Sequence, residues 1–163
     1  MKRFIAGGMF LSLLMVPVFT GDAAAFYVEG LMSGMSSTTA QKILEKFGYE
    51  IVTIQEDGDI VARNRQDASR MITAEFCSDR LVQIRNDYEP KFSRFVQLVE
   101  EKRKSLGGPV SARVIPAKGD LTADADAVSF AWTDKETMVE VMYKVSETGA
   151  QVSVFHRVKQ SCQ

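Results

Sequence analysis

The chain has 163 residues, of which 20 are lysine or arginine and 21 are aspartate or glutamate, so its formal net charge is −1. A nucleic-acid-binding domain usually carries an excess of basic residues, and a disordered chain has few apolar residues and a large net charge. With 45% hydrophobic residues, the composition is typical of neither class and predicts a globular protein.

The first 25 residues have the three parts of a secretory signal peptide. Lys2 and Arg3 supply positive charge, residues 4–19 are almost uninterruptedly apolar, and the segment ends Ala23-Ala24-Ala25. The apolar run is shorter than the roughly 20 residues that cross a bilayer as a helix. We therefore expect cleavage after Ala25, a periplasmic or secreted protein, and no membrane association after cleavage. An uncleaved membrane anchor is the alternative.

The remaining chain, residues 26–163, has the length of one domain. Its first half is predicted to hold one helix and four strands. Apolar residues at helical spacing indicate a helix over 37–47, which Gly48 ends. Strands are predicted at 49–55 and 59–65 around Asp57-Gly58, a preferred hairpin turn pair, and at 70–77 and 80–86 around Ser78-Asp79.

The second half repeats this order of elements. A helix is predicted from Pro90 to Leu106, because Pro suits a first turn, an apolar stripe follows, and Gly107-Gly108-Pro109 ends it. Alternating apolar residues predict four further strands at 110–115, 128–133, 137–145 and 151–158.

These elements predict an α+β fold in the order α-β4-α-β4, in which two helices pack on antiparallel sheet. The halves would be residues 26–88 and 89–163 of one compact domain. Two arrangements stay open at this point, since the halves can share one sheet or stack back to back.

Two cysteines follow the signal segment, Cys77 and Cys162. An even number of cysteines in an exported protein favours a disulfide, which would tie the end of the chain to its middle. Two free thiols, or one reactive thiol, are the alternatives.

Sets of catalytic residues are missing from the sequence. His156 is the only histidine, and we expect it to be a buried or half-buried structural residue. Ser153 lies three positions away, so in a strand the two side chains point to opposite faces and cannot form a dyad. A Cys77–His156 thiol dyad is the alternative. We predict no catalytic, cofactor-binding or metal-binding residue.

Two stretches resemble known families of small exported domains. Gly34-Met35-Ser36, followed by a short helix ending Phe47-Gly48-Tyr49, is similar to the BamE and β-lactamase-inhibitor-protein type, although the lipid-bearing cysteine of BamE is missing. Residues 40–85, with Gly48-Tyr49-Glu50 and Leu81-Val82-Gln83-Ile84, resemble a PepSY-type domain, with Cys77-Ser78-Asp79 in place of its usual turn. Both resemblances imply a non-catalytic module that binds protein or peptide, or modulates an enzyme.

The sequence thus predicts an exported, non-enzymatic protein that binds another protein or a peptide and no nucleic acid. Aromatic strand residues serve as interface anchors or as core, so Trp132, Tyr143 and Phe155 are the candidate interface residues. The alternatives are an inhibitor or modulator of a secreted hydrolase, a small enzyme, and a carrier of copper or calcium. The oligomeric state is left open.

Overall fold

The computed structural model describes residues 25–115, 126–134 and 136–159. Cys162 and residues 1–24 of the predicted signal peptide therefore lie outside the described residues. Among the helices of the described residues, none combines the length and the apolar character needed to cross a membrane.

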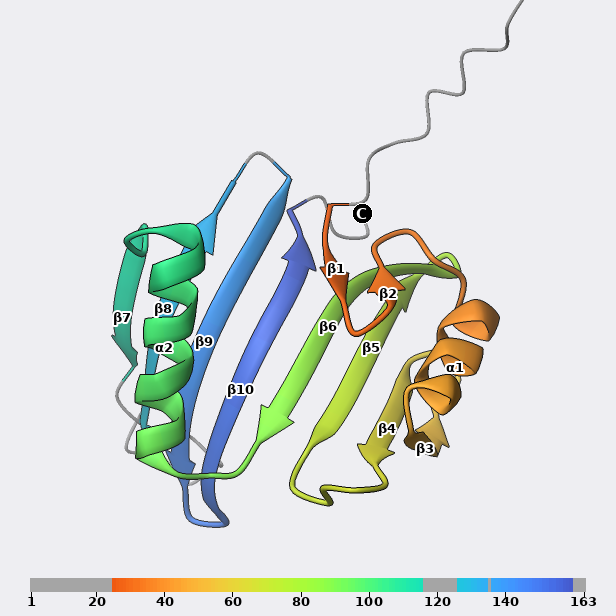
Figure 1. Ribbon diagram of the computed structural model, residues 1–163, viewed down its shortest axis with the longest axis horizontal. Coiled ribbons are helices and arrows are strands. Elements are labelled where there is room, and N and C mark those ends of the chain that lie inside the picture. Colours follow the sequence, from red (N-terminus) through yellow and green to blue (C-terminus); the bar gives the residue numbers. More distant parts are fainter. Residues whose placement is uncertain (1–24, 116–125, 135, 160–163) are drawn as a thin grey trace, which may run out of the picture.

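The predicted fold class is wrong, because sheet dominates the structure. Strands make up 52% of the described residues and helices 20%. Eight strands form one antiparallel sheet, a separate pair of strands precedes them, and the two helices cover only parts of one face (Figure 1). The prediction of an α+β fold with two packing helices failed because the eight predicted strands join into one continuous sheet, of which the helices cover only parts of one face.

Twelve elements follow one another in the described part of the chain. They are β1 (Tyr27–Val28), β2 (Leu31–Met32), α1 (Ser37–Lys46), β3 (Tyr49–Ile54), β4 (Ile60–Asn64), β5 (Met71–Cys77), β6 (Arg80–Tyr88), α2 (Phe92–Leu106), β7 (Ser111–Ile115), β8 (Asp126–Thr133), β9 (Thr137–Ser146) and β10 (Gly149–Val158). The strand order in the large sheet is β3-β4-β5-β6-β10-β9-β8-β7.

One pairing joins the two halves of this sheet. Strand β6 ends the first set of four strands and lies antiparallel to β10, the last strand of the second set, with Asn86 opposite Val154. Of the two arrangements left open by the sequence, the structure has the shared sheet. The β6–β10 pairing therefore decides how side chains of both halves meet.

Helix α1 begins at the predicted residue and ends one residue before the predicted end. Ser36 is the N-cap, and its side chain accepts a hydrogen bond from the backbone of Thr39, which satisfies one of the free N–H groups of the first turn. Gly48 follows the helix with a φ of +84°, a conformation that glycine adopts without steric cost. Ala40 and Leu44 face the sheet and are fully buried.

Two hydrophobic clusters lie on the same face of the sheet, one under each helix. The α1 cluster combines residues of α1, the β1–β2 hairpin and β3 to β6; it contains Phe26, Leu31, Ala40, Leu44, Tyr49, Ile60, Ala62, Ile72, Ala74, Phe76, Leu81 and Ile84. The α2 cluster combines residues of α2, β8, β9 and β10; it contains Phe95, Leu98, Trp132, Val141, Val152 and Val154. Both helices and the hairpin thus cover one face, and no described helix covers the other.

Candidate functional site

The helix-free face carries the side chains that alternate with the core residues. In β10, Val152 and Val154 belong to the α2 cluster, so Ser153, Phe155 and Arg157 point to the opposite side. Their register partners in the neighbouring strands point the same way. We call six of these residues the central face: Arg85 and Asp87 of β6, Ser153, Phe155 and Arg157 of β10, and Glu140 of β9.

Asp87 is the hydrogen-bonding hub of the central face. The Ser153 hydroxyl donates to Asp87 Oδ1 at 2.6 Å, and the Gln151 amide donates to the same oxygen at 3.1 Å. Arg85 Nε lies 3.2 Å from Asp87 Oδ2, and the Arg85 guanidinium donates to Thr73 Oγ1 at 3.1 Å. One carboxylate therefore links β6 to β10, and its arginine partner extends the network to β5.

Phe155 lies beside a second ion pair on the same face. Arg157 donates to Glu140 Oε2 at 2.9 Å, and its guanidinium carbon is 5.3 Å from the centre of the Phe155 ring. Arg85 is the register partner of Phe155 in β6, and Glu140 is its partner in β9. A half-buried aromatic ring is thus flanked by charged side chains on both neighbouring strands.

Both arginines keep an unused donor. The Nε atoms of Arg85 and Arg157 are buried and make no hydrogen bond within the described part of the chain. Arg85 Nε lies 3.2 Å from Asp87 Oδ2, which is within ion-pair distance. Its N–H is not aligned for a hydrogen bond to that oxygen. A buried N–H without an acceptor is costly.

The three predicted interface residues lie in different surroundings. Trp132 is 3% exposed in the α2 cluster, and its Nε1–H donates to the carbonyl oxygen of Gly107 at 2.9 Å. Tyr143 packs against the same cluster, with ring centres 5.3 Å from Phe92 and 5.9 Å from Phe95. Phe155 alone of the three lies on the helix-free face.

His156 is buried, as predicted, on the helix-covered face between the two clusters. Burial, and secondarily the charge of Lys102, lowers its pKa to about 4. Ser153 lies on the opposite face. Cys77 also lies on that opposite face by alternation, because its neighbour Phe76 belongs to the α1 cluster. Neither residue therefore faces His156.

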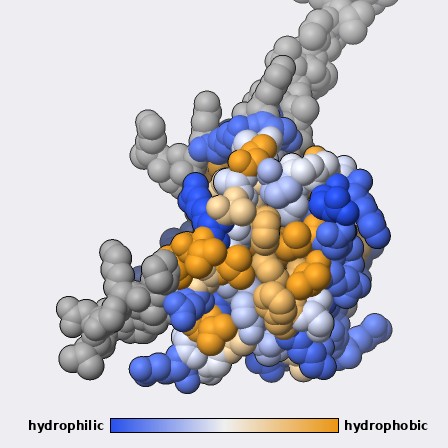
Figure 2. Space-filling view, turned by 90° about the vertical axis from the view of Figure 1, so that its left-hand side faces the viewer, coloured by the Kyte–Doolittle hydropathy of each residue, from blue (hydrophilic) through white to orange (hydrophobic). Residues whose placement is uncertain are grey.

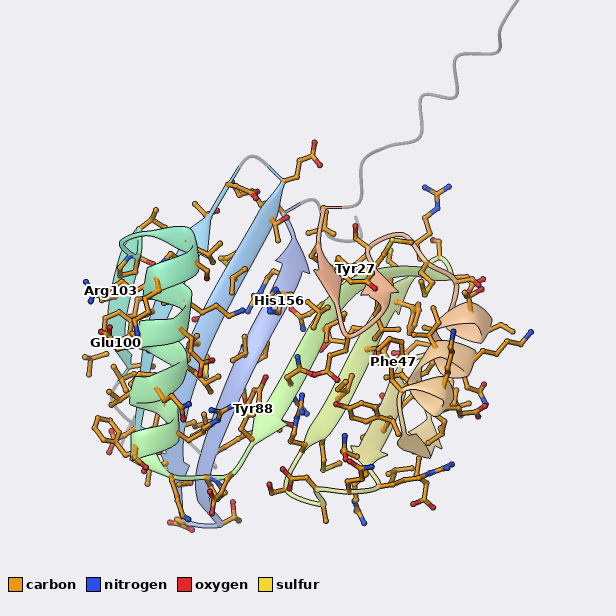
Figure 3. All side chains as sticks on the ribbon, viewed as in Figure 1. Tyr27, Phe47, Tyr88, Glu100, Arg103 and His156 are labelled. Carbon is orange, nitrogen blue, oxygen red and sulfur yellow. The ribbon has the colours of Figure 1, made fainter. Side chains whose placement is uncertain are left out.

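A second polar group, which the sequence did not reveal, lies on the helix-covered face. The guanidinium carbons of Arg70 and Arg94 lie 5.6 Å and 4.9 Å from the centre of the Tyr88 ring. Glu29 of the hairpin turn pairs with Arg70 and accepts a hydrogen bond from Tyr49. Figure 3 shows Tyr88 in the strip between α2 and the α1 half, along which His156 also lies. These contacts fasten the hairpin to the first half, and Arg94 extends them to α2.

Burial is the largest cause of the pKa shifts in this strip. Burial raises the pKa of Tyr88 and lowers the pKa of the Lys102 ammonium. Burial and the nearby Glu29 carboxylate together raise the pKa of Tyr49 to about 12. Within the described ranges, His, Cys, Asp and Glu side chains form no group of three or more that could hold a metal ion.

Comparison of the chain with protein-family models, curated proteins and solved structures finds no match. The resemblances to the PepSY type and to the BamE and β-lactamase-inhibitor-protein type therefore stay predictions.

Proposed function

We propose that this protein is exported and acts, without catalysis, by binding another protein or a peptide on the central face. The observation that carries the proposal is the position of Phe155, a half-buried aromatic side chain at the middle of a sheet face that no described helix covers. Aromatic residues, methionine and arginine are enriched at protein interfaces. Met138 and Met142 of β9 also lie on this face, as register partners of Arg157 and Ser153.

The charges of the central face favour a protein partner. Arg85 lies beside Asp87 and Arg157 beside Glu140, so positive charge is matched by negative charge. A nucleic-acid surface needs an excess of basic residues. An interface with protein typically surrounds its apolar anchors with paired charges and hydrogen-bonding groups, and the central face has this composition.

The same contacts keep the surface rigid before binding. Ser153, Gln151 and Arg85 hold the Asp87 carboxylate from two strands, and Glu140 holds Arg157. A partner then loses less free energy in ordering side chains on this surface than on a flexible loop. The aromatic ring of Phe155 is already in position.

Matched alanine variants test the proposal. Phe155→Ala removes the aromatic ring from the central face, and Phe47→Ala removes an exposed ring from the other side of the molecule, next to α1. Each tagged protein is used to capture partners from a periplasmic extract, with partners quantified by mass spectrometry and folding checked by circular dichroism. We expect Phe155→Ala to lose partners that the wild type and Phe47→Ala both retain. Equal recovery by all three proteins would refute the central face as the binding surface.

The export part of the proposal has its own measurement. Cell fractionation should find the protein outside the cytoplasm, and its intact mass should correspond to a chain that begins at Phe26. A cytoplasmic protein that retains residues 1–25 would refute it.

A further inference from the structure

The two edges of the large sheet differ in how they are protected against further pairing. Strand β3, at one edge, has a bulge between Ile51 and Thr53, and bulges protect edge strands from pairing with other chains. Strand β7, at the other edge, keeps regular register with β8 from Ser111 to Ile115, and no described strand pairs with its outer side. It contains no proline, and Arg113 is its one charged residue. Within the described residues, edge β7 is therefore the side of the sheet that is open to strand addition.

Exposed apolar side chains gather on the same side of the molecule. Of the twelve exposed large hydrophobic residues described, six belong to α2, to β7 or to the residue before β7: Phe92, Val96, Leu106, Val110, Val114 and Ile115. Figure 2 views this side, and hydrophobic surface is prominent on it. Val114 is 80% exposed, an unusual position for a valine in a strand. Such a patch marks an interaction surface in soluble proteins.

We infer that β7 pairs with β7 of a second copy of this chain, antiparallel and about a two-fold axis through Ala112. In this register Val110 lies opposite Val114 of the second copy. Ser111 lies opposite Arg113, and the small Ala112 lies opposite itself. A two-fold axis perpendicular to the sheet keeps the helices of both copies on one face and makes a closed dimer.

The sequence of β7 favours a second copy as the occupant and selects this register. An axis through Arg113 would place two arginines directly opposite each other, and like charges at that position destabilise a strand pair. An axis through Ser111 would bring Pro109 into the pairing, and proline has no N–H to donate. The axis through Ala112 avoids the arginine pair. It keeps Pro109 out of a ladder that runs from Val110 to Val114 and leaves Ile115, which would face Pro109, unpaired. The ladder pairs two exposed valines, so these five residues are complementary to themselves. The inference does not depend on the proposed function, because β7 lies at the edge of the sheet and the central face at its middle.

Sedimentation equilibrium over a range of protein concentrations tests the inference, and we expect a dimer that dissociates on dilution. Val114→Lys places a charge in the new strand pair and should raise the dissociation constant about tenfold or more. Val52→Lys, on the opposite edge strand β3, is the matched control and should leave the constant unchanged. Both valines are exposed, so neither change should unfold the protein. A monomer at every concentration, or equal effects of the two changes, would overturn the inference.

A second pair of variants tests the register. Ser111→Asp should strengthen the dimer several-fold, because each new carboxylate would face Arg113 of the second copy. Ser111→Lys should weaken it by a similar factor. If both changes weaken the dimer equally, or neither changes it, the register through Ala112 is wrong.

Discussion

Asp87 of β6 accepts a hydrogen bond from Ser153 of β10 at 2.6 Å, across the pairing that joins the two halves of the sheet. The Gln151 amide donates to the same carboxylate oxygen, and Arg85 lies beside the other oxygen. The side chain of Asp87 is only 16% exposed, so water replaces these partners poorly. The carboxylate thus holds the central face together where the two halves meet.

Asp87→Ala should lower the free energy of unfolding by about 2–3 kcal/mol, because Ser153 and Gln151 lose their shared acceptor and Arg85 loses its ion-pair partner. Ser153→Ala removes one donor and should cost about 1 kcal/mol. Urea denaturation measures both changes. Glu56→Gln, an exposed change in the β3–β4 turn, is the control and should stay within about 0.5 kcal/mol of wild type. An Asp87→Ala variant as stable as this control would show that the network contributes nothing.

The buried His156 should make the protein less stable in mild acid. Its pKa is lowered from 6.5 to about 4 in the folded state, so between these values the unfolded state binds the proton more tightly. Stability is therefore full above pH 6.5 and is lost as the pH falls towards 4, by roughly 3 kcal/mol for this group. Denaturant titrations at pH 7 and pH 4.5 measure the loss. His156→Gln should remove most of the difference in stability between pH 7 and pH 4.5. If the variant shows the same pH dependence as the wild type, His156 is not its cause.

Gly30 is required in the β1–β2 turn for two separate reasons. Its φ is +83°, and a Cβ atom there would lie 2.6 Å from Phe47 Cε2 and 2.9 Å from Ile43 Cγ2. Gly48 has a similar φ of +84°, but a Cβ atom there would meet no other atom within 4 Å. Gly48→Ala should therefore cost about 1 kcal/mol for backbone strain alone, and Gly30→Ala should cost more. Thermal unfolding compares them, with Gly108→Ala as a control that introduces neither effect. Equal melting temperatures for the first two variants would show that the close approach is unimportant.

The Cys77–Cys162 disulfide stays a prediction, which the strand register supports. Gln83 of β6 pairs with Glu75 on one side and with Arg157 on the other. Strand β10 therefore ends at the same end of the sheet as Cys77, two strands away, which is about 10 Å. The four residues from Val158 to Cys162 can span about 13 Å, so the chain is long enough to bridge this gap.

Alkylation followed by intact-mass measurement decides whether the bond exists. We expect both cysteines to resist alkylation until a reductant is added, and the Cys77→Ser/Cys162→Ser variant to lose about 2–4 kcal/mol of stability. Full alkylation of the native protein without reductant would contradict the prediction.

Local elements could be predicted from the sequence because their signals are local. Gly58 has a φ of +91° in the predicted Asp57-Gly58 turn, and Ser78 and Asp79 have positive φ in the next one. Helix α2 ends at Leu106, before the predicted glycines. The β1–β2 hairpin was missed because its strands have two residues each, too few to show an alternation.

The dominance of one sheet could not be predicted, because it depends on the pairing of β6 with β10, which lie far apart in the chain. The same pairing creates the candidate site. Alternation placed Phe155 and Trp132 in strands, but it gave no means of knowing which face the helices cover. Asp87 lies one residue beyond the predicted strand 80–86, and only the register shows that it meets Ser153.

Photo-crosslinking tests the central claim, that a protein or peptide binds the central face, most directly. A photoreactive phenylalanine analogue replaces Phe155 in one variant and Phe47 in another, and each is irradiated in cells that express the full chain. We expect a crosslinked partner from position 155 and none of the same mass from position 47. Absence of any product at position 155, or the same product from both positions, would contradict the claim.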